Sequence, residues 1–231
     1  MTKSKSIIIL LMTVCLILVF SASVYAKHTR VGIPNSVSYV DSSVDTPIII
    51  FVGDSRTMQC TYGNRNASVL KNYVFCYVNG GSSSVINYKN GKLSGILKNL
   101  LHKYRNDDTI VVFNLGVNGN GNPTKNANRT VKIYDKWIKA YPSIKFYVES
   151  IWPTKITSKK GSYRNSNVVK FNKILKAEYA NKGLYIDAYE YIKRNDLMNG
   201  GMRDKIHYKF NSTKKILKFT RTCATLHNVQ Y

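Results

Sequence analysis

The chain has 231 residues, a length that suits one domain with an ample core. Hydrophobic residues make up 44% and aromatic residues 12%, which excludes a disordered protein. The formal net charge of +23 is spread along the chain, and we expect it to attract an anionic cell-surface polymer. The alternative is a basic surface that serves solubility alone. We do not expect nucleic acid as a partner, because no recognition motif of the usual kinds is present.

The first 26 residues resemble a secretory leader. Lys3 and Lys5 precede an apolar run over residues 7–20, and Ala26 ends a segment similar to a cleavage site. We therefore expect residues 1–26 to be a signal peptide, whose removal lowers the net charge to +21. An uncleaved N-terminal anchor is the alternative, since no charge lies between Lys5 and Lys27. In either case the protein is expected to be secreted or held at the cell surface.

The rest of the chain predicts one α/β domain. We interpret residues 27–45 as a linker or an irregular lead-in and residues 46–231 as the domain. Apolar runs predict five strands, over residues 48–52, 73–78, 109–115, 144–150 and 184–186. Apolar residues at helical spacing, or polar stretches after strands, predict helices after Ser55 and over 93–104, 131–138, 168–179, 187–193 and 212–225. This alternation predicts a mostly parallel five-stranded sheet covered on both faces, with the strand-following loops gathered at one rim.

Ser55 is the candidate nucleophile, because it follows the first buried strand in the sequence Gly53-Asp54-Ser55. A strand that ends in a tight turn presents a hydroxyl at the edge of a sheet. The alternative is a loop serine that caps the helix after it. A nucleophilic serine also needs a base, a group that orients the base, and donors for an oxyanion.

His207 is the candidate base and Asp204 its orienting acid. They lie three residues apart in a strand-following loop, so the carboxylate can accept from Nδ1–H while Nε2 faces the serine. The alternative is a surface ion pair. The other three histidines are less suited by position: His28 in the linker, His102 on the exposed side of a helix, and His227 near the end of the chain.

The candidate oxyanion donors are the backbone N–H groups of Ser55 and Gly81 and the side-chain amide of Asn118. A glycine N–H can be approached closely because no Cβ intervenes, and Gly80 is an alternative to Gly81. Taken one at a time, Gly81 and Asn118 are better explained as turn residues.

Together these motifs resemble the SGNH branch of the GDSL esterase/lipase family, in its bacterial form with G-D-S-R. Residues 53–56 match the first block, Gly81 the second-block glycine, residues 116–118 the start of G-x-N-D, and residues 204–207 the D-x-x-H block, which Tyr208 continues. The resemblance spans residues 48–219. It implies a three-layer flavodoxin-like fold and hydrolysis or transfer of acyl groups through an acyl-serine, without metal or cofactor. Ser55 would be the nucleophile, His207 the base and then the acid, and Asp204 the orienting group.

One position departs from the family pattern. Gly119 follows Asn118 where the family usually has Asp, an acid that helps to hold this loop. Asn120 or Asn122 could aim Asn118 instead. The departure motivates an alternative function, a catalytically weakened SGNH module that binds anionic glycan.

The predicted rim suggests the substrate. Trp152 could offer an aromatic wall, and basic side chains could surround the crevice, which suits an ester on a carbohydrate or an anionic polymer better than a lipid. A solvated basic face is the alternative. The basic side chains that could surround the crevice are Arg56, Lys155, Lys159, Lys160 and Arg164. As a separate point, we expect the protein to be a monomer.

Three cysteines remain after the leader, without metal-type spacing: Cys60, Cys76 and Cys223. Export would permit a Cys60–Cys76 disulfide, and buried thiols are the alternative.

Overall fold

The computed structural model describes residues 36–41, 46–62, 68–105, 108–116, 118, 121–157 and 164–226. The predicted leader, residues 1–26, lies outside this part of the chain. No helix within the described residues combines the length and the apolar character needed to cross a bilayer.

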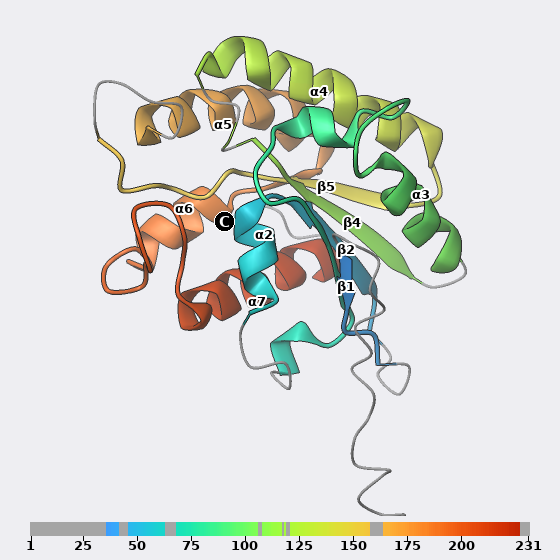
Figure 1. The fold of residues 1–231 in the computed structure, drawn as a ribbon, viewed down its shortest axis with the longest axis horizontal. Helices are drawn as coiled ribbons and strands as arrows, with labels where there is room; N and C mark the ends of the chain where they lie inside the picture. The colour runs from blue at the N-terminus through green and yellow to red at the C-terminus, as the bar shows by residue number, and fades with distance from the viewer. Residues whose placement is uncertain are drawn as a thin grey trace, which may run out of the picture. The chain divides into compact units, whose positions relative to one another are not determined.

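A mixed sheet of six strands forms the centre of the fold, in the order β1-β3-β2-β4-β5-β6 (Figure 1). Five of them pair in parallel, as the sequence predicts: β2 (Ile48–Gly53), β3 (Tyr73–Tyr77), β4 (Thr109–Asn114), β5 (Lys145–Glu149) and β6 (Tyr185–Ile186). Each lies within two residues of its expected bounds. The fold class is therefore confirmed, with one strand more than expected.

The additional strand is β1 (Ser36–Ser38), which pairs antiparallel with β3 at the edge of the sheet. It lies in residues 27–45, so residues 36–38 of the predicted linker or lead-in are part of the sheet. The strand has only three residues, two of them serines, and therefore carries no apolar periodicity. Tyr39, which follows it, is 5% exposed and packs edge-on against Phe75 with ring centroids 5.9 Å apart.

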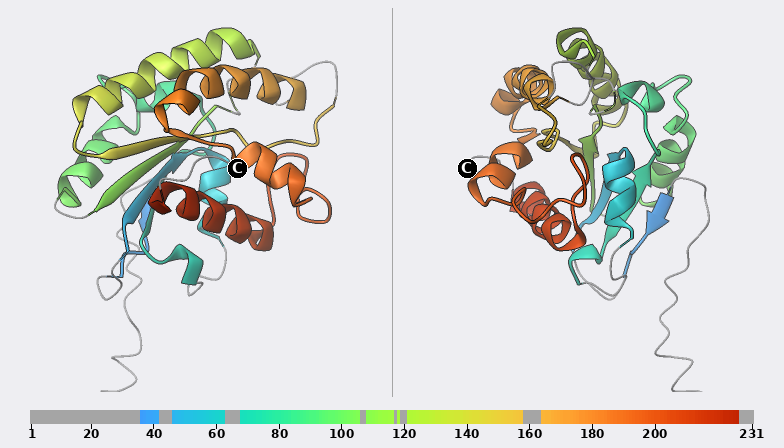
Figure 2. Two further views of the ribbon diagram at one scale, coloured as in Figure 1. Left: turned by 180° about the vertical axis from the view of Figure 1, so that it is seen from behind. Right: turned by 60° about the vertical axis from the view of Figure 1, so that its left-hand side comes forward.

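Helices cover both faces of the sheet (Figures 1 and 2). One face carries α3 (Ser94–Lys103), α4 (Pro123–Ala140) and α5 (Asn165–Tyr179); the other carries α2 (Ser55–Cys60), α6 (Ala188–Arg194) and α7 (Phe210–Leu226). Short 3-10 turns complete the described elements: Ser68–Leu70, Ser83–Ile86 and Ala180–Lys182.

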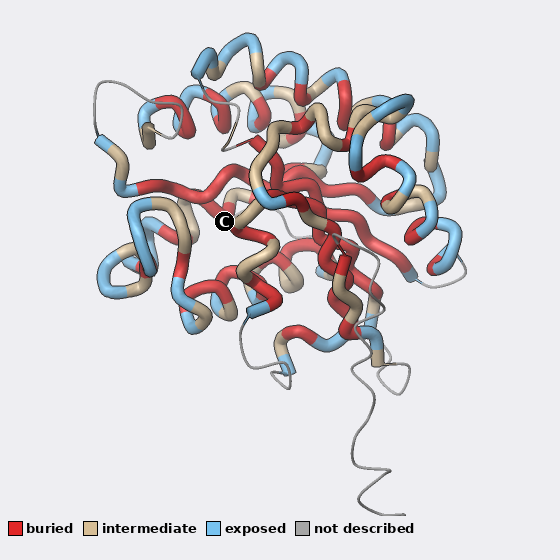
Figure 3. Tube along the Cα trace, in the orientation of Figure 1, coloured by how far each residue is buried: buried red, intermediate tan, exposed pale blue. Residues whose placement is uncertain are grey.

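Strand β2 contributes to both cores in alternation. Ile50 and Val52 belong to the core beneath α3, α4 and α5, whereas Ile49 and Phe51 belong to the core beneath α2, α6 and α7. A strand buried on both faces is apolar throughout, which explains the uninterrupted run of the sequence. Figure 3 shows the buried strands between helices whose outer faces are exposed.

The helix α4 begins eight residues before its predicted range of 131–138. Asn122 caps it, because its side-chain oxygen accepts from the Lys125 N–H at 3.0 Å, and Pro123 stands in the first turn. Proline is favourable there, since that backbone nitrogen needs no partner.

The three cysteines in the described part of the chain are free and buried. Cys60 lies in the core beneath α2, α6 and α7, whereas Cys76 lies in the core on the opposite face of the sheet. The sheet therefore separates the two thiols, and the predicted alternative of buried thiols is the one that the fold adopts.

Candidate active site

Ser55 begins α2 directly after β2. The preceding turn needs glycine, because a Cβ on Gly53 would lie 1.7 Å from the Thr57 hydroxyl oxygen. Asp54 caps the helix, with its Oδ1 accepting from the Arg56 N–H at 3.1 Å. The alternative role of Ser55 as the cap is therefore taken by Asp54. This leaves the Ser55 hydroxyl free for other contacts.

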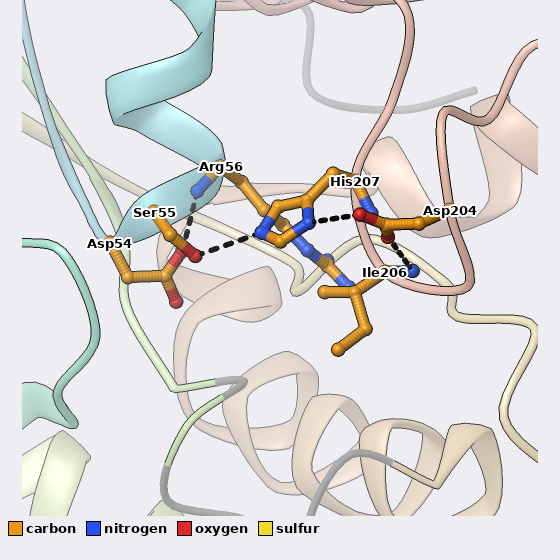
Figure 4. A network of polar contacts seen from close by, with 6 residues as sticks. All are labelled: Asp54, Ser55, Arg56, Asp204, Ile206 and His207. Carbon is orange, nitrogen blue, oxygen red and sulfur yellow. Dashed lines mark hydrogen bonds and ion pairs between the residues drawn. The ribbon is translucent and has the colours of Figure 1, made fainter.

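Ser55, His207 and Asp204 form one hydrogen-bonded chain (Figure 4). Ser55 Oγ lies 3.1 Å from His207 Nε2, and His207 Nδ1 lies 2.7 Å from Asp204 Oδ2. An Nδ1–H that donates to the carboxylate leaves Nε2 to accept the serine proton. The structure thus brings together the three residues that the sequence proposed, from segments 152 positions apart.

The Asp204 carboxylate is fixed by its own loop. Besides the His207 ring, it binds the backbone N–H groups of Ile206 and His207, at 2.7 and 2.8 Å from Oδ1. Its limited burial acts to raise the pKa, but the hydrogen bonds from His207 and Ile206 outweigh it, so the pKa of Asp204 lies below its ordinary value. The carboxylate is therefore ionised at neutral pH, as an orienting group must be.

Asn118 is held by Asp54. Its Nδ2 donates to Asp54 Oδ2 at 3.0 Å, which leaves the second hydrogen of the same amide for another acceptor. The sequence pointed instead to Asn120 or Asn122, but Asn122 caps α4 and Asn120 lies outside the described residues, as does Gly119. The sequence did not reveal Asp54 as the partner because the two residues lie 64 positions apart.

The Asp54 carboxylate is 1% exposed. Burial raises its pKa above the ordinary value, while the Arg56 cation and the hydrogen bonds from the Arg56 N–H and Asn118 act in the opposite direction. The pKa of Asp54 therefore lies above its ordinary value, and these neighbours limit the increase.

Gly80 and Gly81 lie in the loop after β3, the strand whose Tyr77 pairs with Gly53. Their φ angles are +84° and +128°, which favour glycine. A Cβ on Gly81 would also lie 2.8 Å from a methyl carbon of Val85. The loop therefore requires glycine, and the donor role of the Gly81 N–H stays a prediction.

Two predicted rim residues do not lie at a rim. Trp152 is 1% exposed; its ring packs edge-on against Tyr208 and its Nε1 donates to Glu149 Oε1 at 2.6 Å. Arg56 is 2% exposed, and its Nη1 donates to the Trp152 carbonyl at 2.6 Å. Both side chains are directed into the protein, so neither forms the wall of an open crevice.

Other sequence candidates are dispersed. Lys155 is exposed, and its backbone N–H binds the Lys205 carbonyl at 2.8 Å beside the histidine loop. Lys159, Lys160, His28 and His227 lie outside the described residues, and His102 is exposed on α3. Within the described ranges no cluster of three or more His, Cys, Asp or Glu side chains could hold a metal ion.

No protein-family model and no curated protein matches this sequence. Solved structures do match, at low identity. A candidate SGNH hydrolase from Slackia heliotrinireducens is 16% identical, with a TM-score of 0.56 over 79% of this chain and 100% of that chain. The acetyl xylan esterase AlAXEase is 16% identical, with a TM-score of 0.55 over 76% and 98%.

A third match is the C-terminal catalytic domain of peptidoglycan O-acetyltransferase A from Streptococcus pneumoniae, solved with a methylsulfonyl adduct. It is 14% identical, with a TM-score of 0.52 over 80% of this chain and 95% of that domain. The chain therefore has the SGNH hydrolase fold, as its motifs implied.

Proposed function

We propose that this chain is a serine esterase of SGNH type that hydrolyses or transfers acyl groups on a carbohydrate. The observation that carries the proposal is the 3.1 Å contact between Ser55 Oγ and His207 Nε2, with Asp204 2.7 Å from His207 Nδ1. The fold that it shares with an acetyl xylan esterase and an O-acetyltransferase supports ester chemistry, and their names support a carbohydrate ester.

Acylation begins when Ser55 Oγ attacks the carbonyl carbon of the ester while His207 Nε2 takes the hydroxyl proton. Asp204 holds the imidazole in the required tautomer and stabilises the imidazolium that forms. His207 then returns the proton to the departing sugar oxygen as the bond between that oxygen and the acyl carbon breaks. The acyl group is left on Ser55.

The oxyanion of the tetrahedral intermediate needs donors that are already in place. The Ser55 N–H lies in the first turn of α2, where backbone N–H groups have no partner within the helix. The second hydrogen of the Asn118 amide and the Gly81 N–H complete the proposed set. Asp54 restrains Asn118, which offsets the missing acid at position 119.

Deacylation repeats these steps in reverse order, with water as the nucleophile. Water gives its proton to His207 and attacks the acyl carbon, and Ser55 leaves with the proton. A sugar hydroxyl in place of water would make the enzyme a transferase. The two reactions are separated by whether an added saccharide diverts the acyl group from hydrolysis.

We further propose that the enzyme is exported behind residues 1–26, works as a monomer, and acts on or beside an anionic cell-surface polymer. The basic excess of the sequence supports the last point. The mass of the mature secreted protein and its sedimentation would test the first two.

Covalent labelling tests the catalytic proposal. A fluorophosphonate should label the wild-type protein, and Ser55→Ala should abolish the label, whereas Ser166→Ala, on the exposed start of α5, should keep it. Hydrolysis of an aryl acetate should follow the same pattern. A folded wild-type protein that takes no label and turns over no aryl acetate would contradict the proposal and favour the glycan-binding module.

A further inference from the structure

Arg56 is a buried cation that lacks most of its hydrogen-bond partners. Its side chain is 2% exposed, and among the described residues only Nη1 has a hydrogen-bond partner, the Trp152 carbonyl oxygen. Nε and Nη2 are buried, and neither has a hydrogen-bond partner in the part of the chain that the structure describes. Figure 4 shows the side chain running from the start of α2, behind the His207 ring in this view, toward Ile206.

Such an arrangement costs stability. A buried guanidinium is expected to be matched by a carboxylate and further hydrogen bonds, and an apolar side chain of similar size is often at least as stable. Burial accordingly lowers the pKa of Arg56, and the electrostatic influence of Tyr208, Asp54 and Asp204 opposes that effect. Folding alone does not explain this residue.

The Nη1 bond connects α2 with the histidine loop. It fixes the carbonyl of Trp152, and the next carbonyl, that of Pro153, accepts from the Tyr208 hydroxyl at 2.9 Å. Two residues further, the Lys155 N–H binds the Lys205 carbonyl at 2.8 Å. Residues 152–155 therefore lie between Arg56 and the loop that carries the base, and they are bonded to both.

The backbone and charge of Arg56 act on the opposite side of the site. Its N–H donates to Asp54 Oδ1, and its cation favours the ionised form of that carboxyl. Asp54 Oδ2 in turn accepts from the Asn118 amide. Arg56 is thus connected to the His207 loop through residues 152–155, and to the Asn118 amide through Asp54.

We propose that Arg56 is a positioning residue that holds the His207 loop and the Asn118 amide in register with Ser55. It acts through the carbonyl of Trp152 on one side and the carboxylate of Asp54 on the other. Its catalytic consequence rests on the function proposed above, whereas its effect on the histidine loop does not.

The test compares Arg56→Met, which removes the charge and the bond, with Arg56→Lys, which keeps the charge. Arg221→Met is the matched control, because Arg221 also donates to a backbone carbonyl, that of Lys71. Arg221 lies on α7, with its guanidinium over the ring of Tyr73 in β3. Each variant is measured for thermal unfolding and for aryl acetate hydrolysis as a function of pH.

Arg56→Met should lose about 10- to 100-fold in kcat, with little change in KM, because the reacting groups shift while substrate contacts remain. Its melting temperature should not fall, since the variant removes an unmatched buried charge. The acid limb of its pH–rate profile should move to higher pH, because Asp54 loses the cation that favours its ionised form. Arg56→Lys should restore part of the rate and of the profile, and Arg221→Met should keep both.

A wild-type rate and pH profile in Arg56→Met would overturn the proposal, as would a loss of rate that only follows a loss of stability. Hydrogen exchange gives a readout that does not need activity. The Ile206 and His207 amides, which bind Asp204, should exchange faster in Arg56→Met, while β2 and β4 amides stay protected. Unchanged exchange at the loop would contradict the proposal even if the wild-type protein proved inactive, an outcome that would separately refute the esterase.

Discussion

At the scale of single residues, Asp54 has two tasks that can be separated by one substitution. Asp54→Asn keeps a good helix cap at Oδ1 but places an NH₂ group opposite the Asn118 amide, so that two donors meet. We expect the fold to persist and kcat to fall about 10- to 100-fold, because the Asn118 amide is no longer held in position to donate to the oxyanion.

Two comparisons check this prediction. Asn118→Ala, which removes the donor itself, should cost about 100- to 1000-fold in kcat. The double variant should be no worse than Asn118→Ala, since both changes act on one donor. Independent, multiplying losses would show that Asp54 does not work through Asn118.

A second prediction concerns Glu149, which is fully buried among the elements that carry the site. It accepts from Asn114 Nδ2 at 3.1 Å and Trp152 Nε1 at 2.6 Å, and also from the Thr220 hydroxyl. Burial raises the pKa of Glu149 from 4.5 to about 7, while the bonds from Thr220 and Trp152 act to lower it. Between these values the folded state retains a proton that the unfolded state has released. The free energy of unfolding should therefore fall as the pH rises through this interval, by about 3 kcal/mol from this group.

Glu149→Gln removes this titration while keeping the shape. The Thr220 hydroxyl can donate to the Ile216 carbonyl instead, at 3.0 Å, and accept from the new amide. Thermal unfolding from about pH 4.5 to about pH 7 should show a flatter decline than in the wild type; some slope should remain because burial also raises the pKa of Asp54. Glu178→Gln, at a partly exposed ion pair on α5, serves as the control. An unchanged slope in Glu149→Gln would show that this carboxyl does not titrate there.

At the scale of elements, the junction of β2 and α2 decides where the nucleophile stands. Gly53→Ala would force a Cβ against the buried Thr57 side chain and within 3.2 Å of the Asn114 carbonyl. We expect a loss of about 1–3 kcal/mol in the free energy of unfolding, as for other overpacked sites, and a loss of esterase activity because α2 moves. Denaturant unfolding measures the first effect and aryl acetate turnover the second.

Gly95→Ala is the matched control for this substitution. Gly95 is exposed in α3, and a Cβ there would meet no atom within 4 Å. Alanine should therefore stabilise the protein by about 0.5–1 kcal/mol through its better helix propensity. If Gly53→Ala behaved in the same way, the tight strand-to-helix turn would not be what places Ser55.

Helix geometry also explains which side-chain predictions failed. Successive residues of an α-helix point about 100° apart, so that when Ser55 faces the site, Arg56 points away from it. The sequence analysis placed both side chains at the rim because the two residues are adjacent after a strand. The type of a residue does not show in which direction its side chain points. Trp152 failed for a related reason: it follows a strand, but the sheet and Tyr208 enclose its ring.

At the scale of the whole molecule, much of the fold was predictable from the sequence because most of its signals are local. Apolar runs located five strands, and residues 53–55 and 204–207 lie where their motifs implied. β1 was not predicted because its three residues, two of them serines, form a strand only through their pairing with β3. Two contacts were not predicted because each joins residues far apart in the sequence: Asp54–Asn118, 64 positions apart, and Arg56–Trp152, 96 positions apart.

The same edge strand yields a prediction for the intact protein. A chain that begins at Thr46 would lack β1 and the packing of Tyr39 on Phe75, and would expose the edge of β3. Compared with a chain that begins at Lys27, we expect a melting temperature lower by about 5 °C or more and a tendency to associate. Thermal unfolding and light scattering check both points, and equal behaviour of the two chains would show that β1 neither stabilises the fold nor protects the edge of β3.

The three buried thiols can report when a layer of helices separates from the sheet. Burial raises the pKa of Cys76 and Cys223 to about 12 and raises that of Cys60 as well, so all three are protonated at neutral pH. An alkylating reagent can modify each cysteine only when its layer opens. Cys76 lies on one side of the sheet and the other two lie on the opposite side. The order in which mass spectrometry finds them modified will therefore reveal which layer of helices detaches first.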